Sequence, residues 1–457
     1  MKVIVCGAGQ VGSSIVRHLA AEDNDVTVID QSAELIRKIG DSLDVKAMQG
    51  FASHPDVLEA AGIRDADMII AVTYADEVNM VACQVAHSLF DVPTKIARVR
   101  HQSYLQPGWS NLFSRDHMPI DVIISPEIEV GRAIMRRLEV PGAFDMLSMA
   151  DGKIRVIGVR CTADTPIVHT PLRQLTELFP ELNIIVIGIV RDGKGFVPSA
   201  DDHMLPNDEV YFVAETEHVS RAMMTFGHEE ATARRVVILG GGNIGRYLAG
   251  EIERHPGVTS KVIEYDKLRA EAAAAALERT IVLHGDALDI EILAEASVET
   301  AEAVVAVTNE DEVNILASLL AKRAGSQRAI TLVNKLGYTP LVSGLGIDVT
   351  VNPRAITVST ILQHIRRGRI RAVHSLGEGF GEVIEAEALE TSGLVGPPLR
   401  DIDFPDGVII GALIRGDEVI IPRGDTVVKT KDRVILFATA GAVKKVEKMF
   451  SVRLEFF

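Results

Sequence analysis

The sequence predicts an α/β protein built from two doubly wound, Rossmann-like domains with parallel sheets, each followed by a small α+β domain. Three observations favour this fold class. The apolar stretch Lys2–Cys6 runs straight into a glycine-rich turn and then an amphipathic stretch, the order of strand, turn and helix that opens a dinucleotide-binding unit. The same pattern returns after residue 235. Strand and helix patterns then alternate regularly in both halves, which is typical of a mostly parallel sheet with helices on both faces.

Each glycine of the first turn has a separate physical role. Gly7 permits the turn, Gly9 lets the backbone approach a phosphate, and Gly12 lets the helix pack closely on the strand. The helix N-terminus offers backbone N–H groups and partial positive charge to a pyrophosphate. A structural turn without a ligand is the alternative. The predicted nucleotide contacts in this turn are Gly7, Ala8, Gly9, Gln10, Val11 and Gly12.

An acid follows the second predicted strand of each half. Asp30 ends the apolar run Val26–Ile29, where a carboxylate accepts hydrogen bonds from both ribose hydroxyls. In the second half the apolar run 236–239 leads into another glycine turn, and Glu264 supplies the acid. The residues predicted for the second nucleotide are Gly240, Gly241, Gly242, Asn243, Ile244, Gly245 and Glu264.

The repeat extends far beyond the glycine turns. The stretch 71–79 is nearly repeated as 306–314, so the chain contains a duplicated pair of domains. Ligands of such sheets bind at the carboxyl ends of the strands. We therefore expect Thr73 to bond a phosphate or ribose and Arg98 to clamp a phosphate, although a solvated surface arginine is an alternative for Arg98. The remaining residues of these strand ends in the predicted sites are Tyr74, Thr308 and Asn309.

The predicted domains span residues 1–140, 141–227, 232–370 and 371–457. An amphipathic helix leaves each large domain, at 126–138 and at 353–366. Each helix presents an apolar stripe that packs either on a neighbouring domain or on the sheet of its own domain. The stripes are Ile128, Ile134 and Leu138 in the first helix, and Ile356, Ile361 and Ile365 in the second.

Composition excludes several classes of protein. A net charge of −16 argues against binding to nucleic acid or directly to an anionic membrane leaflet. One dense basic cluster, 366–371, is either a helix end that complements its dipole or a phosphate site. The longest apolar runs are strand-sized, and the chain starts with a strand rather than a signal peptide, so we expect a soluble, cytosolic protein. Cys6, Cys83 and Cys161 lie far apart and predict neither a disulfide framework nor a metal site.

The sequence also lacks the residues that an enzyme of this fold class needs. None of the six tyrosines is followed four residues later by a lysine, and no phosphate-binding loop of the ATPase type occurs. Two nucleotide sites in one chain without a catalytic set indicate a sensor. An NAD-dependent oxidoreductase is the alternative, and a nucleic-acid-binding redox sensor is disfavoured by the charge.

The combination of motifs resembles the cytosolic nucleotide-binding subunits of bacterial Trk potassium-uptake systems. The resemblance covers the whole chain and rests on the two glycine turns, on Asp76–Asn79 with Cys83, on Ala97–Arg100, and on 285–287 and 311–314. It implies two N-type nucleotide-binding domains, each followed by a C-type domain. It further implies NAD(H) and ATP or ADP as ligands, with Asp286 among the contacts.

The resemblance also implies an assembly. The expected partner is an integral-membrane potassium transport subunit of the TrkH or TrkG type, at the cytoplasmic face of the inner membrane. Rings of eight nucleotide-binding units imply a homotetramer of this two-unit chain. Two departures predict unequal sites: Phe51 stands where the family usually has the aspartate that Asp286 retains, and Leu332 stands where the first half has Arg98.

Overall fold

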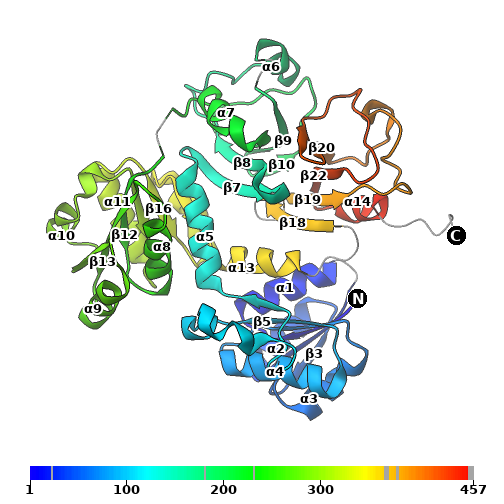
Figure 1. The fold of residues 1–457 in the computed structure, drawn as a ribbon, viewed down its shortest axis with the longest axis vertical. Coiled ribbons are helices and arrows are strands. Elements are labelled where there is room, and N and C mark those ends of the chain that lie inside the picture. Colours follow the sequence, from blue (N-terminus) through cyan, green and yellow to red (C-terminus); the bar gives the residue numbers. More distant parts are fainter. Residues whose placement is uncertain (22–23, 180–181, 230–231, 365–369, 377–379, 451–457) are drawn as a thin grey trace.

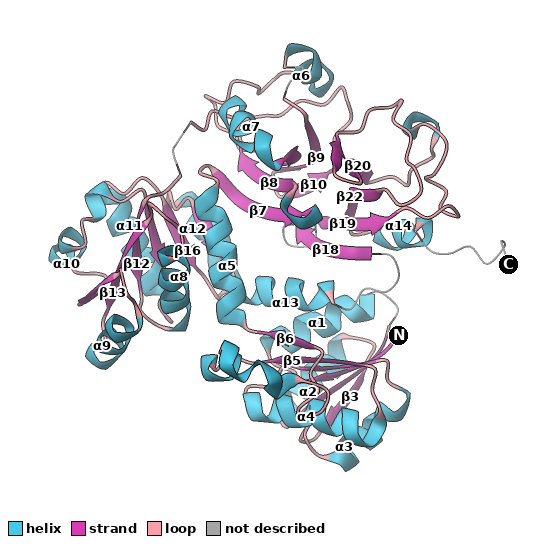
Figure 2. Ribbon diagram, in the orientation of Figure 1, coloured by secondary structure: helices cyan, strands magenta, loops and turns pink. Residues whose placement is uncertain are grey.

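The computed structural model describes the chain except residues 22–23, 180–181, 230–231, 365–369, 377–379 and 451–457. It confirms the predicted fold class: two six-stranded parallel sheets and two five-stranded antiparallel sheets (Figures 1 and 2). The first parallel sheet has the order β3-β2-β1-β4-β5-β6, in which the direction of winding reverses between β1 and β4. Its strands are β1 Lys2–Cys6, β2 Asp25–Asp30, β3 Lys46–Gln49, β4 Met68–Ala71, β5 Thr94–Arg98 and β6 Val122–Ile124.

Helices follow the strands as the sequence predicts. In the first large domain they are α1 Gln10–Ala21, α2 Ala33–Ser42, α3 Pro55–Ala61, α4 Asp76–Phe90 and the exit helix α5 Pro126–Glu139. The second large domain repeats the plan with the sheet order β14-β13-β12-β15-β16-β17. Its elements are β12 Arg235–Leu239, α8 Asn243–Glu253, β13 Thr259–Glu264, α9 Lys267–Ala276, β14 Ile281–His284, α10 Ile290–Glu295, β15 Ala303–Ala306, α11 Asp311–Ala324, β16 Ala329–Leu332, α12 Thr339–Gly344, β17 Val349–Val351 and α13 Pro353–Gln363.

Each small domain is an antiparallel sheet with short helices. The first has the order β10-β9-β11-β8-β7 and the second β18-β19-β22-β20-β21. The first contains β7 Ala143–Met149, β8 Ile154–Arg160, α6 Leu172–Leu178, β9 Ile184–Arg191, β10 Lys194–Phe196, β11 Glu209–Glu215 and α7 Val219–Thr225. The second contains β18 Ile370–Leu376, β19 Gly381–Glu387, β20 Val408–Arg415, β21 Glu418–Ile420, β22 Arg433–Thr439 and α14 Val443–Met449.

The two small sheets pack against one another through a shared apolar core. The ring of Phe380 lies so close to the first sheet that a Cβ added at Gly195 would come within 2.1 Å of it. The same kind of buried ion pair stabilises both domains: Arg191 donates to both oxygens of Asp208, and Arg415 to both oxygens of Asp432. The basic cluster at 366–371 lies largely outside the described residues, so its two interpretations both stay open.

The two exit helices are exchanged between the large domains. Helix α5, from the first domain, packs against α8 of the second, whereas α13 packs against α1 of the first (Figure 1). Most of their apolar side chains complete the core of the other half's sheet, so the expectation of packing on a neighbouring domain is confirmed for these residues. The buried residues are Val130, Ile134 and Leu138 in α5, and Val358, Ile361 and Leu362 in α13.

The stripes differ in detail from the prediction. Val130, not Ile128, heads the buried stripe of α5, since Ile128 is only half-buried. Ile356 packs partly into the second core, and Ile365 lies outside the described residues. Helix α13 therefore contacts the cores of both large domains.

We expect the α5–α8 crossing to be sensitive to side-chain size at Gly131. A Cβ added there would come within 2.3 Å of the Tyr247 ring. At the equivalent positions of the other crossing stand Val358 and Ser14. Gly131→Val should therefore lower the free energy of unfolding by about 1–3 kcal/mol, measured by chemical denaturation, because of overpacking. The double variant Gly131→Val with Tyr247→Ser copies the other crossing and should recover most of the loss; equal stability of the wild type and the single variant would contradict the argument.

Candidate functional site

The glycine turns have the geometry that their roles require. Gly7 adopts φ +111° and Gly240 φ +112°, in the left-handed region that favours glycine. A Cβ on Gly12 would lie 1.8 Å from the carbonyl oxygen of Gly7, so the helix approaches the strand as closely as predicted. In contrast, a Cβ on Gly9 would meet nothing within 4 Å. The backbone at Gly9 thus faces open space, where a ligand can approach it.

The acid after the second strand closes each turn. The carboxylate of Asp30 accepts the N–H of Ala8 at 2.7 Å and the N–H of Ser32 at 2.8 Å. Glu264 does the same with the N–H of Gly241 at 2.6 Å and that of Asp266 at 2.9 Å. Each carboxylate oxygen retains a second lone pair for a ribose hydroxyl. The acids therefore shape the turn as well as facing the expected ribose.

The two turns reach this arrangement with paired changes of side chain. The first combines Ala8 with Asp30, and the second combines Gly241 with the longer Glu264. A Cβ on Gly241 would lie 3.0 Å from the Cβ of Glu264 and 3.2 Å from its Oε2. The glycine thus makes room for the additional methylene. Glu264 is buried, whereas Asp30 is half-buried, so the second acid is less accessible.

In both halves a buried asparagine joins the ends of two neighbouring strands by hydrogen bonds. The sequence reasoning did not assign a role to this residue. Asn79 accepts the N–H of Thr73 at 2.8 Å and its hydroxyl at 2.7 Å, and donates to the carbonyl of Arg98 at 2.9 Å. Asn314 repeats the pattern with Thr308 and Leu332. The exact repetition of this residue in both halves is the signal that marks it. The threonine hydroxyl donates to the asparagine in each half, which leaves the lone pairs of the Thr73 oxygen open, whereas the Thr308 oxygen also accepts the N–H of Glu310 at 3.3 Å.

Arg98 is not a solvated surface arginine. Its Nη2 donates to the carbonyl of Thr73 at 2.7 Å, and its Nε is buried without a hydrogen-bond partner in the described part of the chain. Burial lowers the pKa of the guanidinium. The positive charge of the guanidinium suits an anionic ligand at this strand end, but the Nε itself has almost no exposed surface. Leu332 occupies the equivalent strand end in the second half and is buried, so that crevice lacks this positive charge.

The outer rims of the crevices also differ. Tyr74 is 87% exposed after β4, and its counterpart Asn309 is exposed as well. Phe51 is exposed after β3, where the second half carries the exposed Asp286. The structure thus brings every predicted site residue of each half to the carboxyl edge of one sheet, and the first edge is the more aromatic.

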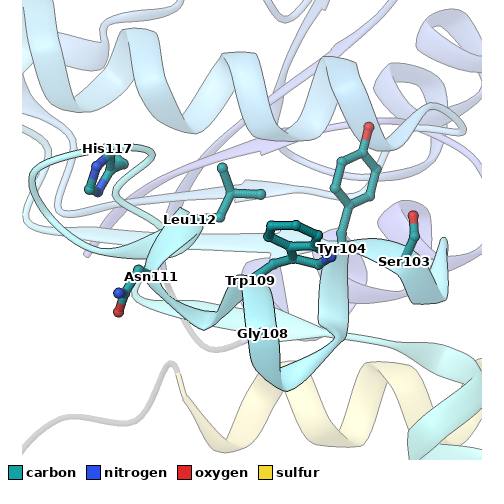
Figure 3. A pocket seen from close by; sticks show the side chains of 7 residues that line it. All are labelled: Ser103, Tyr104, Gly108, Trp109, Asn111, Leu112 and His117. Carbon is teal, nitrogen blue, oxygen red and sulfur yellow. The ribbon is translucent and has the colours of Figure 1, made fainter.

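A separate hollow of about 470 Å³ lies on the segment that follows β5 (Figure 3). The side chains of Tyr104, Trp109 and Leu112 line it, and the Tyr104 hydroxyl donates to Glu77 at 3.3 Å. Burial, with Glu77 as the second cause, raises the pKa of Tyr104. None of the predicted nucleotide contacts lines this hollow.

Metal and thiol chemistry find no support among the described residues, which contain no group of three side chains suited to a metal ion. The three cysteines are buried free thiols. Burial raises the pKa of Cys83 and of Cys161 to about 12, and that of Cys6 well above its usual range. Such thiols are poor nucleophiles at neutral pH.

The domain composition matches a known class of protein. Residues 3–126 and 236–353 match the TrkA-N domain, and residues 156–227 and 383–451 match the TrkA-C domain. Trk system potassium uptake protein TrkA of Azorhizobium caulinodans is 56% identical over 458 residues and all of both chains. Its namesake of Halomonas elongata is 43% identical over the full length of both. The chain belongs to the TrkA family of Trk system potassium uptake proteins.

Solved structures with the same fold include domains of a channel protein. The GsuK RCK domain aligns with a TM-score of 0.60 at 18% identity, covering 99% of this chain and 95% of that one. The GsuK channel bound to NAD aligns with a TM-score of 0.60 at 16% identity, covering 99% and 79%. At these identities the likeness establishes the fold. No helix among the described residues is long and apolar enough to cross a membrane.

Proposed function

We propose that this chain is the regulatory subunit of a Trk-type potassium uptake system, and that it binds nucleotides at both glycine turns to gate an integral-membrane potassium transport subunit of the TrkH or TrkG type. The observation that carries the proposal is the coupling of each crevice to an exchanged helix. Helix α1 starts at the first glycine turn and contacts α13 through Ser14, whose hydroxyl accepts a hydrogen bond from Arg354. A ligand that favours one arrangement of these helices shifts the whole protein toward it.

The proposed ligands are NAD(H) and ATP or ADP, with NAD(H) preferred at the first crevice. The first crevice offers the open backbone at Gly9, the acid Asp30 and the positive charge of Arg98. The second lacks that arginine and buries its acid, Glu264, so the two affinities should differ. The GsuK channel has been solved with NAD bound, which agrees with this choice.

We expect NADH to bind and NADPH to bind poorly, because Asp30 and Glu264 repel a 2′-phosphate. Asp30→Ala should weaken NADH binding at the first crevice about ten- to a hundredfold, since a hydrogen bond to a charged group contributes roughly 1.5–3 kcal/mol. Isothermal titration with NADH and NADPH measures both effects. Equal affinity for the two dinucleotides would contradict the proposed contacts.

The regulatory role is tested by uptake. In cells lacking their own gene of this family, the wild-type chain should restore rubidium uptake, and the variant Gly9→Val with Gly242→Val should not. Both glycines face open space, so valine blocks the ligand rather than the fold. Gly441→Val is a matched control, because Gly441 also has nothing within 4 Å and lies outside the crevices.

The alternative, an NAD-dependent oxidoreductase, predicts a different result when purified protein is incubated with NADH. Purified protein would then oxidise NADH continuously with some substrate, and Gly9→Val would abolish that turnover. A regulator binds NADH without consuming it.

A homotetramer at the cytoplasmic face of the membrane is the proposed assembly. Two equivalent faces are left with exposed apolar side chains. Helix α4 exposes Val81 and Leu89, and the second half exposes Leu316 on α11, Leu341 on α12 and Leu345 directly after α12. Apolar patches of this kind mark protein interfaces. Because each chain carries two such faces, successive copies can join into a closed ring.

Light scattering should report about four chains per particle. The double variant Val81→Glu with Leu316→Glu places charges on both exposed faces and should dissociate the particle while the thermal unfolding temperature changes little. Lys38→Glu, a charge reversal at an exposed residue of α2 and away from these faces, serves as the control. A wild-type protein that stays monomeric at micromolar concentration would contradict the ring.

A further inference from the structure

The loops that follow β3 and β14 have the same backbone frame. The N–H of Gly50 donates to the carbonyl of Asp30 at 3.0 Å, and the N–H of Gly285 donates to that of Glu264 at 2.9 Å. A Cβ on Gly50 would clash at 2.7 Å with Val57, as one on Gly285 would with Ile292. Differences between the side chains of these loops are therefore changes on an unchanged scaffold.

Two positions of this frame change together. In the first half Phe51 is 53% exposed and stacks on His54, with ring centroids 5.2 Å apart and planes at 28°. In the second half Asp286 and Asp289 stand at these positions. Both aspartates serve the local backbone: Asp286 accepts the N–H of Leu288, and Asp289 caps α10 by accepting the N–H of Glu291. The first half thus has the stacked rings of Phe51 and His54 at the two positions where the second half has acids that bond to the loop backbone.

The rings lie on the side of the crevice where a base belongs. Asp30 is the ribose acid at the end of β2, and the adjacent strand β3 pairs with β2 so that Asp30 faces Gln49. Phe51 follows two residues later and lies exposed at the same carboxyl edge. A nucleotide with its phosphates at the glycine turn and its ribose on Asp30 carries its base toward this edge.

We propose that Phe51, backed by His54, is the stacking platform for the adenine ring in the first crevice. The proposal rests on the proposed nucleotide function. An exposed phenylalanine held parallel to a second ring is pre-organised for stacking, so little side-chain freedom is lost on binding. The second crevice carries its exposed ring elsewhere, at Tyr265, which is 74% exposed and directly follows Glu264.

The test uses the full-length chain with Gly242→Val, which leaves the first crevice as the binding site. Phe51→Ala should weaken NADH and ADP about tenfold, the order of effect seen when a base loses one stacked ring. Phe51→Tyr should bind both within about twofold of the parent, since it keeps the ring. Trp109→Ala, which removes an exposed ring outside both crevices, is the matched control and should change nothing.

Two further probes separate stacking from a general effect on the fold. Reduced nicotinamide mononucleotide lacks the adenosine half, so its affinity should not respond to Phe51→Ala. Etheno-ADP, a fluorescent adenine analogue, should be quenched on binding to the parent protein and not to Phe51→Ala. Thermal unfolding of each variant excludes loss of the folded protein.

The outcomes distinguish this inference from the proposed function. If NADH binds, Gly9→Val abolishes that binding, and Phe51→Ala leaves the NADH and ADP affinities unchanged, the platform is disproved while nucleotide binding stands. If neither NADH nor ADP binds the parent protein, the proposed function itself fails. A loss of mononucleotide affinity equal to that of NADH would assign Phe51 to loop structure and also overturn the platform.

Discussion

The structure depends on the exchange of helices α5 and α13. Each large sheet lacks one covering helix of its own and receives it from the other half, so both hydrophobic cores are completed only when the two halves associate. Polar contacts reinforce the exchange: Arg328, just before β16, donates to the carbonyls of Arg137 and Val140 at the end of α5. A cation at that end also opposes the helix dipole. The two large domains are therefore one folding unit, although each has its own sheet and crevice.

The same exchange joins the crevices to the small domains. Helix α13 lies on α1 and leads into β18, and α5 lies on α8 and leads into β7, so each glycine turn is one helix contact away from the small sheet of the opposite half. The small sheets are in turn fixed to one another by polar contacts around their shared core. Arg433 pairs with Asp151 at 2.6 Å, and the N–H of Ala150 donates to Glu385. Packed interfaces of this kind shift between discrete arrangements rather than deforming continuously. We therefore expect a displacement of α1 to be transmitted as a movement of whole domains.

Much of this follows from the sequence, and the failures have physical causes. Strands rich in β-branched residues, the glycine turns and the short helix α6 were predictable from local pattern. Strand β7 was not, because its sequence Ala-Phe-Asp-Met-Leu-Ser-Met contains no β-branched residue and gains its strand conformation from pairing with β8. An amphipathic stripe shows that α5 has an apolar face without showing which sheet it covers. The role of Asn79 was hidden for a similar reason, since its amide joins the ends of two strands that only the fold brings together.

Comparing the two halves distinguishes residues that maintain the fold from residues that line the proposed nucleotide crevices. Three polar features are the same in both halves. The first is the buried asparagine that joins two strand ends. The second is the aspartate, Asp76 or Asp311, that accepts backbone N–H groups of the loop after β5 or β16, and the third is the Arg–Asp pair of each small domain. Several positions at the crevices differ between the halves: Asp30, Arg98 and Phe51 correspond to Glu264, Leu332 and Asp286. If both crevices were selected for one ligand, the contacts with that ligand would be expected to persist as well as the scaffold does. Their replacement on a retained scaffold argues that the two crevices respond to different ligands or concentrations. A chain with unequal sites and a shared exchange of helices can thus combine two nucleotide signals in one movement.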